Sequence, residues 1–174
     1  MVDRIKMKLN LTEGYYESKE DVNQVFYEMS DELANTMYKA YSNSVDFEGD
    51  TLEDFQDEIS NVFKGLYGEF MPNLSSVIEK DDKIIGGLLL CIFKGEPTIT
   101  YLFTNPDYQR KDVATVLLEN TCYKLLNEGF KYLYLYLNLN NIPAYNLFDK
   151  FGFNEIIYEK NKRKNLEDYY EYNN

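Results

Sequence analysis

Histidine and tryptophan are both absent from this 174-residue sequence, and cysteine occurs only twice. Without histidine, the Ser-His-Asp and Cys-His forms of nucleophilic catalysis are excluded, and the commonest zinc ligand is missing. Cys91 and Cys122 each lie in an apolar run and form no CxxC motif, so we expect them to be buried thiols in a reducing compartment. We therefore predict a protein without a metal site.

Long apolar segments are also lacking. The first ten residues, MVDRIKMKLN, contain no apolar signal core, and no later run approaches the length of a transmembrane helix. We therefore expect a cytoplasmic protein with no membrane partner.

Basic residues are a minority, with 18 Lys and Arg against 30 Asp and Glu and a formal net charge of −12. Such a charge repels phosphate backbones and anionic lipids, so nucleic acid is not expected as a partner. The acidity has two interpretations. It keeps the protein soluble, which is the interpretation we favour, or it attracts a cationic small molecule or a basic peptide.

The sequence does contain enough apolar residues for a core, at 44% of the chain, with 17 tyrosines and 11 phenylalanines. A chain of this length is most simply one domain, and we find no internal repeat and no low-complexity linker. We therefore predict one domain over residues 1–174.

Alternation and helix-capping signals organise the first half of the chain. Residues 4–11 alternate between apolar and polar, as in a half-buried strand. Two capping boxes, Ser18 with Asp21 and Thr51 with Asp54, each predict the start of a helix. The first predicted helix places its apolar residues on one stripe: Val22, Val25, Phe26, Met29, Leu33 and Met37.

The second half alternates strands with helices. Two strands, 75–79 and 83–93, flank an Asp81-Asp82 turn, and Gly86-Gly87 indicates a bulge or a close backbone approach. The other predicted elements are a strand at 98–104, a helix at 112–127, a strand at 131–140, a helix capped by Asn141, a strand at 153–158 and a short edge strand at 169–172. The predicted fold is a mixed α/β unit of order β-α-α-β-β-β-α-β-α-β, with helices on both faces of its sheet.

The strand KYLYLYLNLN has leucines on one face and tyrosines on the other. Both faces are apolar enough to be covered, so we expect a central strand between two helix layers.

Two motifs resemble the GNAT superfamily of N-acetyltransferases, and the resemblance extends over nearly the whole chain. The segment NPDYQRKDVATVLL, residues 105–118, resembles the family's strand–turn–helix motif, in which Q/R-x-x-G-x-G/A precedes an aliphatic helix. The resemblance implies that amides of this turn hold the pyrophosphate of coenzyme A, and that the preceding strand pairs with the pantetheine arm. The coenzyme-binding residues implied in this way are Leu102, Phe103, Thr104, Gln109, Arg110, Lys111, Asp112, Val113, Ala114, Thr115, Asn141 and Phe148.

The second motif, NIPAYNLFDKFGF at residues 141–153, resembles the family's N-x-x-A-x-x-L-Y-x-K-x-G-F. Its Asn141 is expected to contact the coenzyme. Phe148 occupies the position of the family's tyrosine, which gives a proton to the departing thiolate, and phenylalanine has no proton to give. Tyr145, one turn earlier, is the candidate replacement; the alternative is that Tyr145 is one more surface tyrosine.

A second departure from the family pattern is Asp112, which replaces the first glycine of the turn. Its carboxylate adds bulk and like charge beside a pyrophosphate, at a cost of roughly 4 kcal/mol for charges about 4 Å apart in an effective dielectric near 20, before Arg110 and Lys111 offset it. The alternative, which we favour, is that Asp112 points away as a helix cap or interacts with the positive helix end.

The acceptor side and the general base are predicted from the acidic segment DFEGD, which looks like the loop between the first two helices of some family members. Asp46, Phe47 and Glu48 are the candidate substrate-binding residues. Glu96 is the candidate base, with Asp46 and Glu48 as alternatives; each can equally be a solvated surface charge.

The resemblance thus implies acetyl transfer from acetyl-CoA to a primary amine on a small cationic molecule or a peptide. Direct attack in a ternary complex is expected, because no histidine-activated nucleophile exists to carry the acetyl group. A catalytically impaired acyl-CoA-binding or interaction module is the alternative that Asp112 and Phe148 motivate, and a different acyl donor is a third hypothesis. Family analogy also suggests a homodimer.

Overall fold

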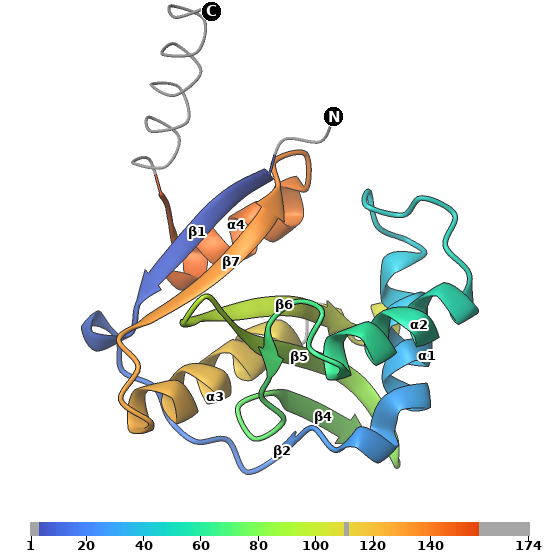
Figure 1. Ribbon diagram of the computed structural model, residues 1–174, viewed down its shortest axis with the longest axis horizontal. Helices are drawn as coiled ribbons and strands as arrows, with labels where there is room; N and C mark the ends of the chain where they lie inside the picture. Colours follow the sequence, from blue (N-terminus) through green and yellow to red (C-terminus); the bar gives the residue numbers. More distant parts are fainter. Residues whose placement is uncertain (1–3, 110–111, 157–174) are drawn as a thin grey trace, which may run out of the picture.

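A computed structural model describes residues 4–109 and 112–156 (Figure 1). Within these ranges the strands form one eight-stranded mixed sheet of order β2-β4-β5-β6-β7-β1-β8, and β3 pairs with β5. The strands are β1 Arg4–Asn10, β2 Val22–Gln24, β3 Glu69–Phe70, β4 Ser76–Lys80, β5 Lys83–Phe93, β6 Glu96–Thr104, β7 Tyr132–Asn138 and β8 Asn154–Glu155. The α-helices are α1 Ser30–Tyr41, α2 Leu52–Phe63, α3 Val113–Asn127 and α4 Ile142–Phe151.

The helices cover both faces of the sheet, as predicted. One core lies between the sheet and α3 with α4, and includes the leucines of β7 and the apolar residues of β1. A second core lies under α1 and α2 and includes residues of β3 to β6. Figure 1 shows α1 and α2 beside β5 and β6, while β1 and β7 extend away from them.

The capping box at the start of α2 is confirmed. Thr51 Oγ1 accepts from the backbone N–H of Asp54 (3.2 Å), and Asp54 Oδ2 accepts from the backbone N–H of Thr51 (2.7 Å). The bond from the Thr51 backbone, followed by that from its hydroxyl, lowers the pKa of Asp54. The two ends of the box thus satisfy amides that a helix start leaves unpaired.

The first predicted helix begins later than its capping box suggested. Ser18 and Asp21 do not start a helix; Val22–Gln24 instead forms β2, which pairs with the edge of β4, and α1 begins only at Ser30. Pairing with an available sheet edge therefore overrides the local capping signal. Of the six apolar residues predicted to line one face of this helix, only Leu33 and Met37 lie in α1, and both are fully buried.

The β4–β5 hairpin agrees with its prediction. Asp81 and Asp82 both take positive φ angles (51° and 60°), which Asp tolerates better than most residues. The register of the pair shifts between Ile78 and Glu79, opposite Gly86. A Cβ on Gly86 would lie 2.6 Å from Val113 Cγ1 and 3.2 Å from the Phe103 carbonyl oxygen. The glycine therefore permits the close approach of α3 to β5.

The prediction that helices cover both faces of β7 is wrong. The leucines of β7 are buried, but on the opposite face Tyr132 and Tyr136 are 37% and 40% exposed. That face is covered partly by lysines of β1: Lys8 Nζ lies 3.9 Å from the ring centroid of Tyr132, and Lys6 Nζ lies 4.8 Å from that of Tyr134.

The parallel pair β6–β7 is the feature that positions the site. Its register covers only Thr98 with Tyr134 and Ile99 with Leu135, whereas β6 pairs with β5 as far as Thr104. After Ile99 the two strands diverge (Figure 1). The register of β6 on β5 also shifts between Leu89 and Leu90, so that Thr100 is an extra residue at the start of the divergence.

Among the described residues, no helix is long and apolar enough to cross a membrane. The end of the predicted strand 153–158 and the predicted edge strand 169–172 lie outside the described residues.

Candidate functional site

The turn from β6 into α3 has an unusual backbone at Asp112. Asn105 Oδ1 accepts from Asp107 N (3.0 Å) and caps a short 3₁₀ turn over Pro106–Tyr108. Asp112 then takes φ 59° and ψ 18°, the left-handed conformation, immediately before Val113 begins the helix. This conformation suits glycine best and is open to aspartate, which explains how Asp112 can stand at a position where glycine was expected.

The side chain of Asp112 is exposed and makes no capping hydrogen bond, although the residue occupies the N-cap position. The carbonyl oxygen of Asp112 accepts the first backbone hydrogen bond of the helix, from Val116 N (2.9 Å). The amides of Val113, Ala114 and Thr115 precede that bond, and amides in this position of a helix are available to an anion. Arg110 and Lys111 lie outside the described residues.

The end of β6 offers backbone groups on the side from which β7 diverges. Asn105 donates its backbone N–H to the Ile85 carbonyl oxygen of β5 (2.8 Å). Because peptide groups alternate in direction along an extended strand, those of Leu102 and Thr104 point away from β5, and that of Phe103 points toward it. Two of the three residues predicted to contact the pantetheine arm therefore have suitably directed backbone groups.

The α1–α2 loop meets the start of α4 through one carboxylate. Asp46 Oδ2 accepts from Asn141 Nδ2 (2.7 Å), and Asp46 Oδ1 accepts from Asn138 Nδ2 (3.2 Å). Asn141 Oδ1 also accepts from Ala144 N (3.2 Å) and so caps α4 as predicted. The structure thus brings together a predicted substrate-binding residue and a predicted coenzyme-binding residue. Phe47 and Glu48 follow in the same loop with exposed side chains.

The two aromatic residues of α4 occupy different environments. Phe148 is 6% exposed, and its ring packs edge-on against Phe153 with centroids 5.4 Å apart. Tyr145 is half-buried and packs against the same core from its border. Phe148 thus has the surroundings of a core residue.

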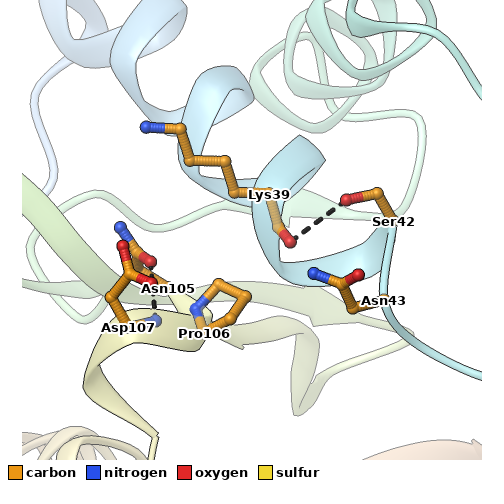
Figure 2. A pocket seen from close by; sticks show the side chains of 6 residues that line it. All are labelled: Lys39, Ser42, Asn43, Asn105, Pro106 and Asp107. Carbon is orange, nitrogen blue, oxygen red and sulfur yellow. Dashed lines mark hydrogen bonds between the residues drawn. The ribbon is translucent and has the colours of Figure 1, made fainter.

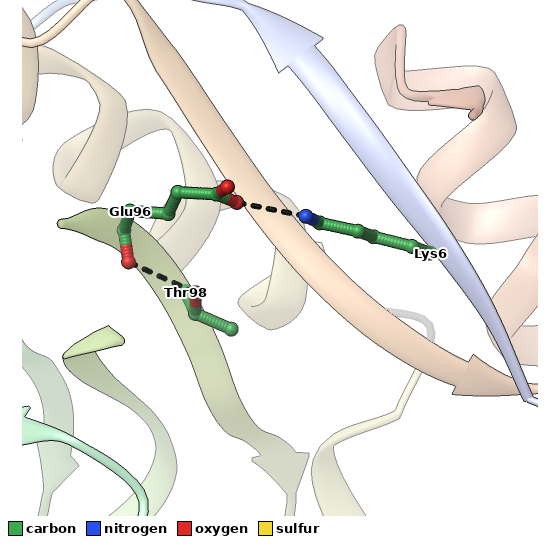
Figure 3. A network of polar contacts seen from close by, with 3 residues as sticks. All are labelled: Lys6, Glu96 and Thr98. Carbon is green, nitrogen blue, oxygen red and sulfur yellow. Dashed lines mark hydrogen bonds and ion pairs between the residues drawn. The ribbon is translucent and has the colours of Figure 1, made fainter. Parts of the chain in front are cut away.

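Glu96 is separated from the other candidates. It begins β6, at the end where β6 and β7 are still paired, and its Oε2 lies 2.9 Å from Lys6 Nζ of β1. Figure 3 shows Lys6 reaching across β7 to this carboxylate, while Thr98 Oγ1 donates to the Glu96 carbonyl oxygen (3.0 Å).

A pocket of about 190 Å³ lies between the end of α1 and the turn that follows β6 (Figure 2). This volume is below the roughly 300 Å³ at which small-molecule sites begin, so the pocket can receive only part of a ligand. Its lining residues come from two segments: Lys39, Ser42 and Asn43, and Asn105, Pro106 and Asp107.

Sequence reasoning missed a polar cluster beside the divergence of β6 and β7. Tyr101 Oη donates to Glu58 Oε1 of α2 (2.8 Å), and the ring of Tyr41 lies edge-on to that of Tyr101 with centroids 6.0 Å apart. Burial, and then the adjacent charge of Glu58, raise the pKa of Tyr101 well above its usual range. No local motif marks this pair, because its two members are 43 residues apart in the chain.

Within the described ranges, no group of three or more acidic or cysteine side chains has the arrangement of a metal site. Cys91 and Cys122 are both buried free thiols, as predicted, and burial raises the pKa of each.

Comparisons with known proteins agree with this geometry. Residues 30–153 match the sequence model of the Acetyltransferase (GNAT) family. The chain is 29% identical over 100 residues to the [ribosomal protein bS18]-alanine N-acetyltransferase of Salmonella typhimurium, a match that covers 58% of this chain and 66% of that protein. The chain thus spans just under two thirds of the length of this curated relative.

Two solved structures share the fold. The ribosomal-protein-S18-alanine N-acetyltransferase of Escherichia coli superposes with a TM-score of 0.62 at 18% identity, covering 78% of this chain and 77% of that chain. The PaiA N-acetyltransferase of Thermoplasma acidophilum, solved in complex with coenzyme A, has a TM-score of 0.59 at 16% identity and covers 74% and 86% of the two chains.

Proposed function

Because this chain belongs to the GNAT acetyltransferase family, we propose that it transfers an acetyl group from acetyl-CoA to a primary amine. One observation carries the proposal: β6 diverges from β7 after Ile99 and then leads through a left-handed residue into the start of α3. This arrangement offers strand amides to one part of the coenzyme and helix amides to another.

The residues present fit the coenzyme at the backbone level. The peptide groups of Leu102 and Thr104 would hold the pantetheine arm, and the amides of Val113 to Thr115 would receive the pyrophosphate. Gln109 is proposed to contact the coenzyme as well, and so are Arg110 and Lys111, which lie outside the described residues. The exposed carboxylate of Asp112 opposes an anion there.

The acceptor is proposed to be cationic and to enter beside the α1–α2 loop, where Asp46 is fixed by Asn138 and Asn141. The names of similar proteins suggest two substrate classes to test: an alanine of a protein, from the bS18-alanine N-acetyltransferase, and a small amine, from the aminoglycoside N-acetyltransferase AAC(6')-Iy. Amide groups of β6 would orient the thioester for direct attack by the amine, which forms the C–N bond as the C–S bond breaks. Tyr145 is proposed to protonate the thiolate that leaves. The two buried free thiols support a cytoplasmic location.

The test has two stages. Titration calorimetry with acetyl-CoA should show saturable binding. Incubation with acetyl-CoA and spermidine, kanamycin or an alanine-initiated peptide should then yield at least one acetylated product by mass spectrometry. Binding without any acetylated amine would support the alternative of an acyl-CoA-binding module, which the buried Phe148 favours. Absence of binding at millimolar acetyl-CoA would contradict both.

A further inference from the structure

Tyr101 lies on β6 just after the point where this strand stops pairing with β7. It is the second residue after Ile99, the last position at which β6 pairs with β7. Its ring packs with the core under α1 and α2, which is the side of the sheet opposite α3 and α4. If the coenzyme pairs with Leu102 and Thr104, its thioester lies near this residue, and the acceptor approaches from the side that carries the Tyr101 hydroxyl.

That hydroxyl already makes a directional bond to a carboxylate. Tyr101 Oη donates to Glu58 Oε1 at 2.8 Å, and both side chains are only partly buried. An oxygen that donates its proton to Glu58 keeps its lone pairs free to accept another proton. The pair can therefore pass a proton from the surface of the site, through the Tyr101 hydroxyl, to the Glu58 carboxylate on α2.

The other titratable groups around the pair come from each neighbouring element. Tyr67, just after α2, hydrogen-bonds with Glu58, and burial together with this bond raises the pKa of Tyr67 to about 12. Tyr41 of α1 faces Tyr101, and Arg4 of β1 interacts electrostatically with Tyr67. Asp46 in turn acts on Tyr41. Within the described residues, Glu58 is the carboxylate that contacts Tyr101 directly.

We propose that Tyr101 is the catalytic group that deprotonates the acceptor ammonium, with Glu58 as the final acceptor of the proton. The proposal rests on the proposed acetyl transfer and assigns the base that the reaction requires. It places the base where β6 diverges from β7, whereas Glu96 is held by Lys6 at the far, paired end of β6.

The relay balances without any further reactant. The ammonium gives a proton to Tyr101 Oη while the Tyr101 hydroxyl proton passes to Glu58, so that tyrosine stays neutral and glutamate becomes a carboxylic acid. The neutral amine then attacks the thioester carbonyl carbon and the C–S bond breaks. The nitrogen loses its second proton as the amide forms, Tyr145 gives its proton to the thiolate and regains one from that nitrogen, and Glu58 returns its proton to the solvent. Because burial and the Glu58 charge disfavour the phenolate form of Tyr101, this residue passes a proton on and does not store the charge.

The decisive experiment is the pH dependence of kcat/KM for Glu58→Gln and Tyr101→Phe. The acceptor is whichever of spermidine, kanamycin and the alanine-initiated peptide the wild type acetylates. At pH 7 we expect each variant to be slower by about 10² or more, the lower end of general-base contributions. The loss should shrink steadily toward about pH 9.5, because a growing fraction of the amine is already deprotonated in solution as the pH approaches or passes the amine's own pKa. The double variant should be no slower than the single ones.

Matched controls separate this role from a structural one. Asp57→Asn removes the charge of the exposed neighbour of Glu58 on α2 and should stay within about threefold of wild type at every pH. Unfolding midpoints check that each variant folds. A loss that is the same at pH 7 and pH 9.5, or no loss, would overturn the relay while leaving acetyl transfer intact. A wild type that acetylates none of the three amines would instead contradict the proposed function.

Discussion

Asp112 shows how one residue can keep a backbone conformation while changing the chemistry of a turn. The structure explains why aspartate is tolerated, since φ of 59° is a conformation that aspartate can adopt. It also shows that the side chain is exposed and does not cap α3, so no capping bond offsets the carboxylate. We therefore expect this carboxylate to repel a pyrophosphate that binds at the turn.

We therefore expect Asp112→Gly to bind acetyl-CoA about fivefold more tightly, which corresponds to roughly 1 kcal/mol for one exposed like charge about 4 Å away in water. Asp112→Asn should give a similar gain, because asparagine tolerates the same backbone and lacks the charge. Titration calorimetry measures both, with Asp149→Asn on the exposed part of α4 as the control. Unchanged affinity in both variants would mean that the carboxylate does not face the bound coenzyme.

At the scale of elements, the contact between Asp46 and Asn141 joins the α1–α2 loop to α4. Asn141 serves both as the cap of α4 and as a donor to Asp46, and Asn138 holds the other carboxylate oxygen. The loop that would border the acceptor is thereby fixed to the helix that would border the coenzyme. Loss of this connection should affect folding stability and acceptor binding together.

Asn141→Ala should lower the free energy of unfolding by about 1–2 kcal/mol, since it removes a helix cap as well as a bond to a charged group. Asp46→Ala should be coupled to it, with an interaction energy of at least about 0.5 kcal/mol in a double-mutant cycle from denaturant unfolding. Asn140→Ala changes an exposed neighbour and should leave stability within about 0.5 kcal/mol of wild type. If the losses in unfolding free energy for Asn141→Ala and Asp46→Ala are strictly additive, the contact between these two side chains does not stabilise the fold.

Much of this element-scale structure could be predicted from local sequence. The capping box at Thr51, the Asp81-Asp82 turn and the Asn141 cap are each encoded within a few residues, and the structure contains all three. The cap at Ser18 failed because β2 pairs with β4, a contact between segments about 50 residues apart that local propensity does not register.

The site was less predictable than the fold for the same physical reason. Motif similarity located the β6–α3 turn and the start of α4, but it could not place side chains that meet across the sheet. Tyr101 and Glu58 come from a strand and a distant helix, and neither has a distinctive local pattern. The tyrosine face of β7 is exposed because α1 and α2 cover other strands of the sheet. The alternation of leucine and tyrosine within one strand does not reveal how far a distant helix extends.

For the whole molecule, the net charge of −12 sets the long-range field that a substrate meets. A cationic acceptor is drawn toward such a surface, and salt weakens this attraction as the Debye length falls from about 30 Å at 0.01 M to about 8 Å at 0.15 M. If the acceptor is cationic, the charge would affect its capture and so its KM, whereas kcat would depend on local groups.

Steady-state kinetics with spermidine should show its KM rising about threefold or more between these two ionic strengths, with kcat nearly constant. The KM for acetyl-CoA is an internal control, because this anion is repelled by the same field and its KM should not rise. A spermidine KM that is independent of salt would indicate that the acidity serves solubility alone.

Acetyl transfer by this protein is the central proposal. Its most direct test is to incubate the purified protein with acetyl-CoA and the three amines and to measure, by mass spectrometry and thiol titration, acetylated amine and free coenzyme A in the same sample. We predict acetylation of at least one amine, with one thiol released for each acetyl group transferred. Saturable binding of acetyl-CoA with no acetylated amine would contradict this claim and leave a binding module on an acetyltransferase fold.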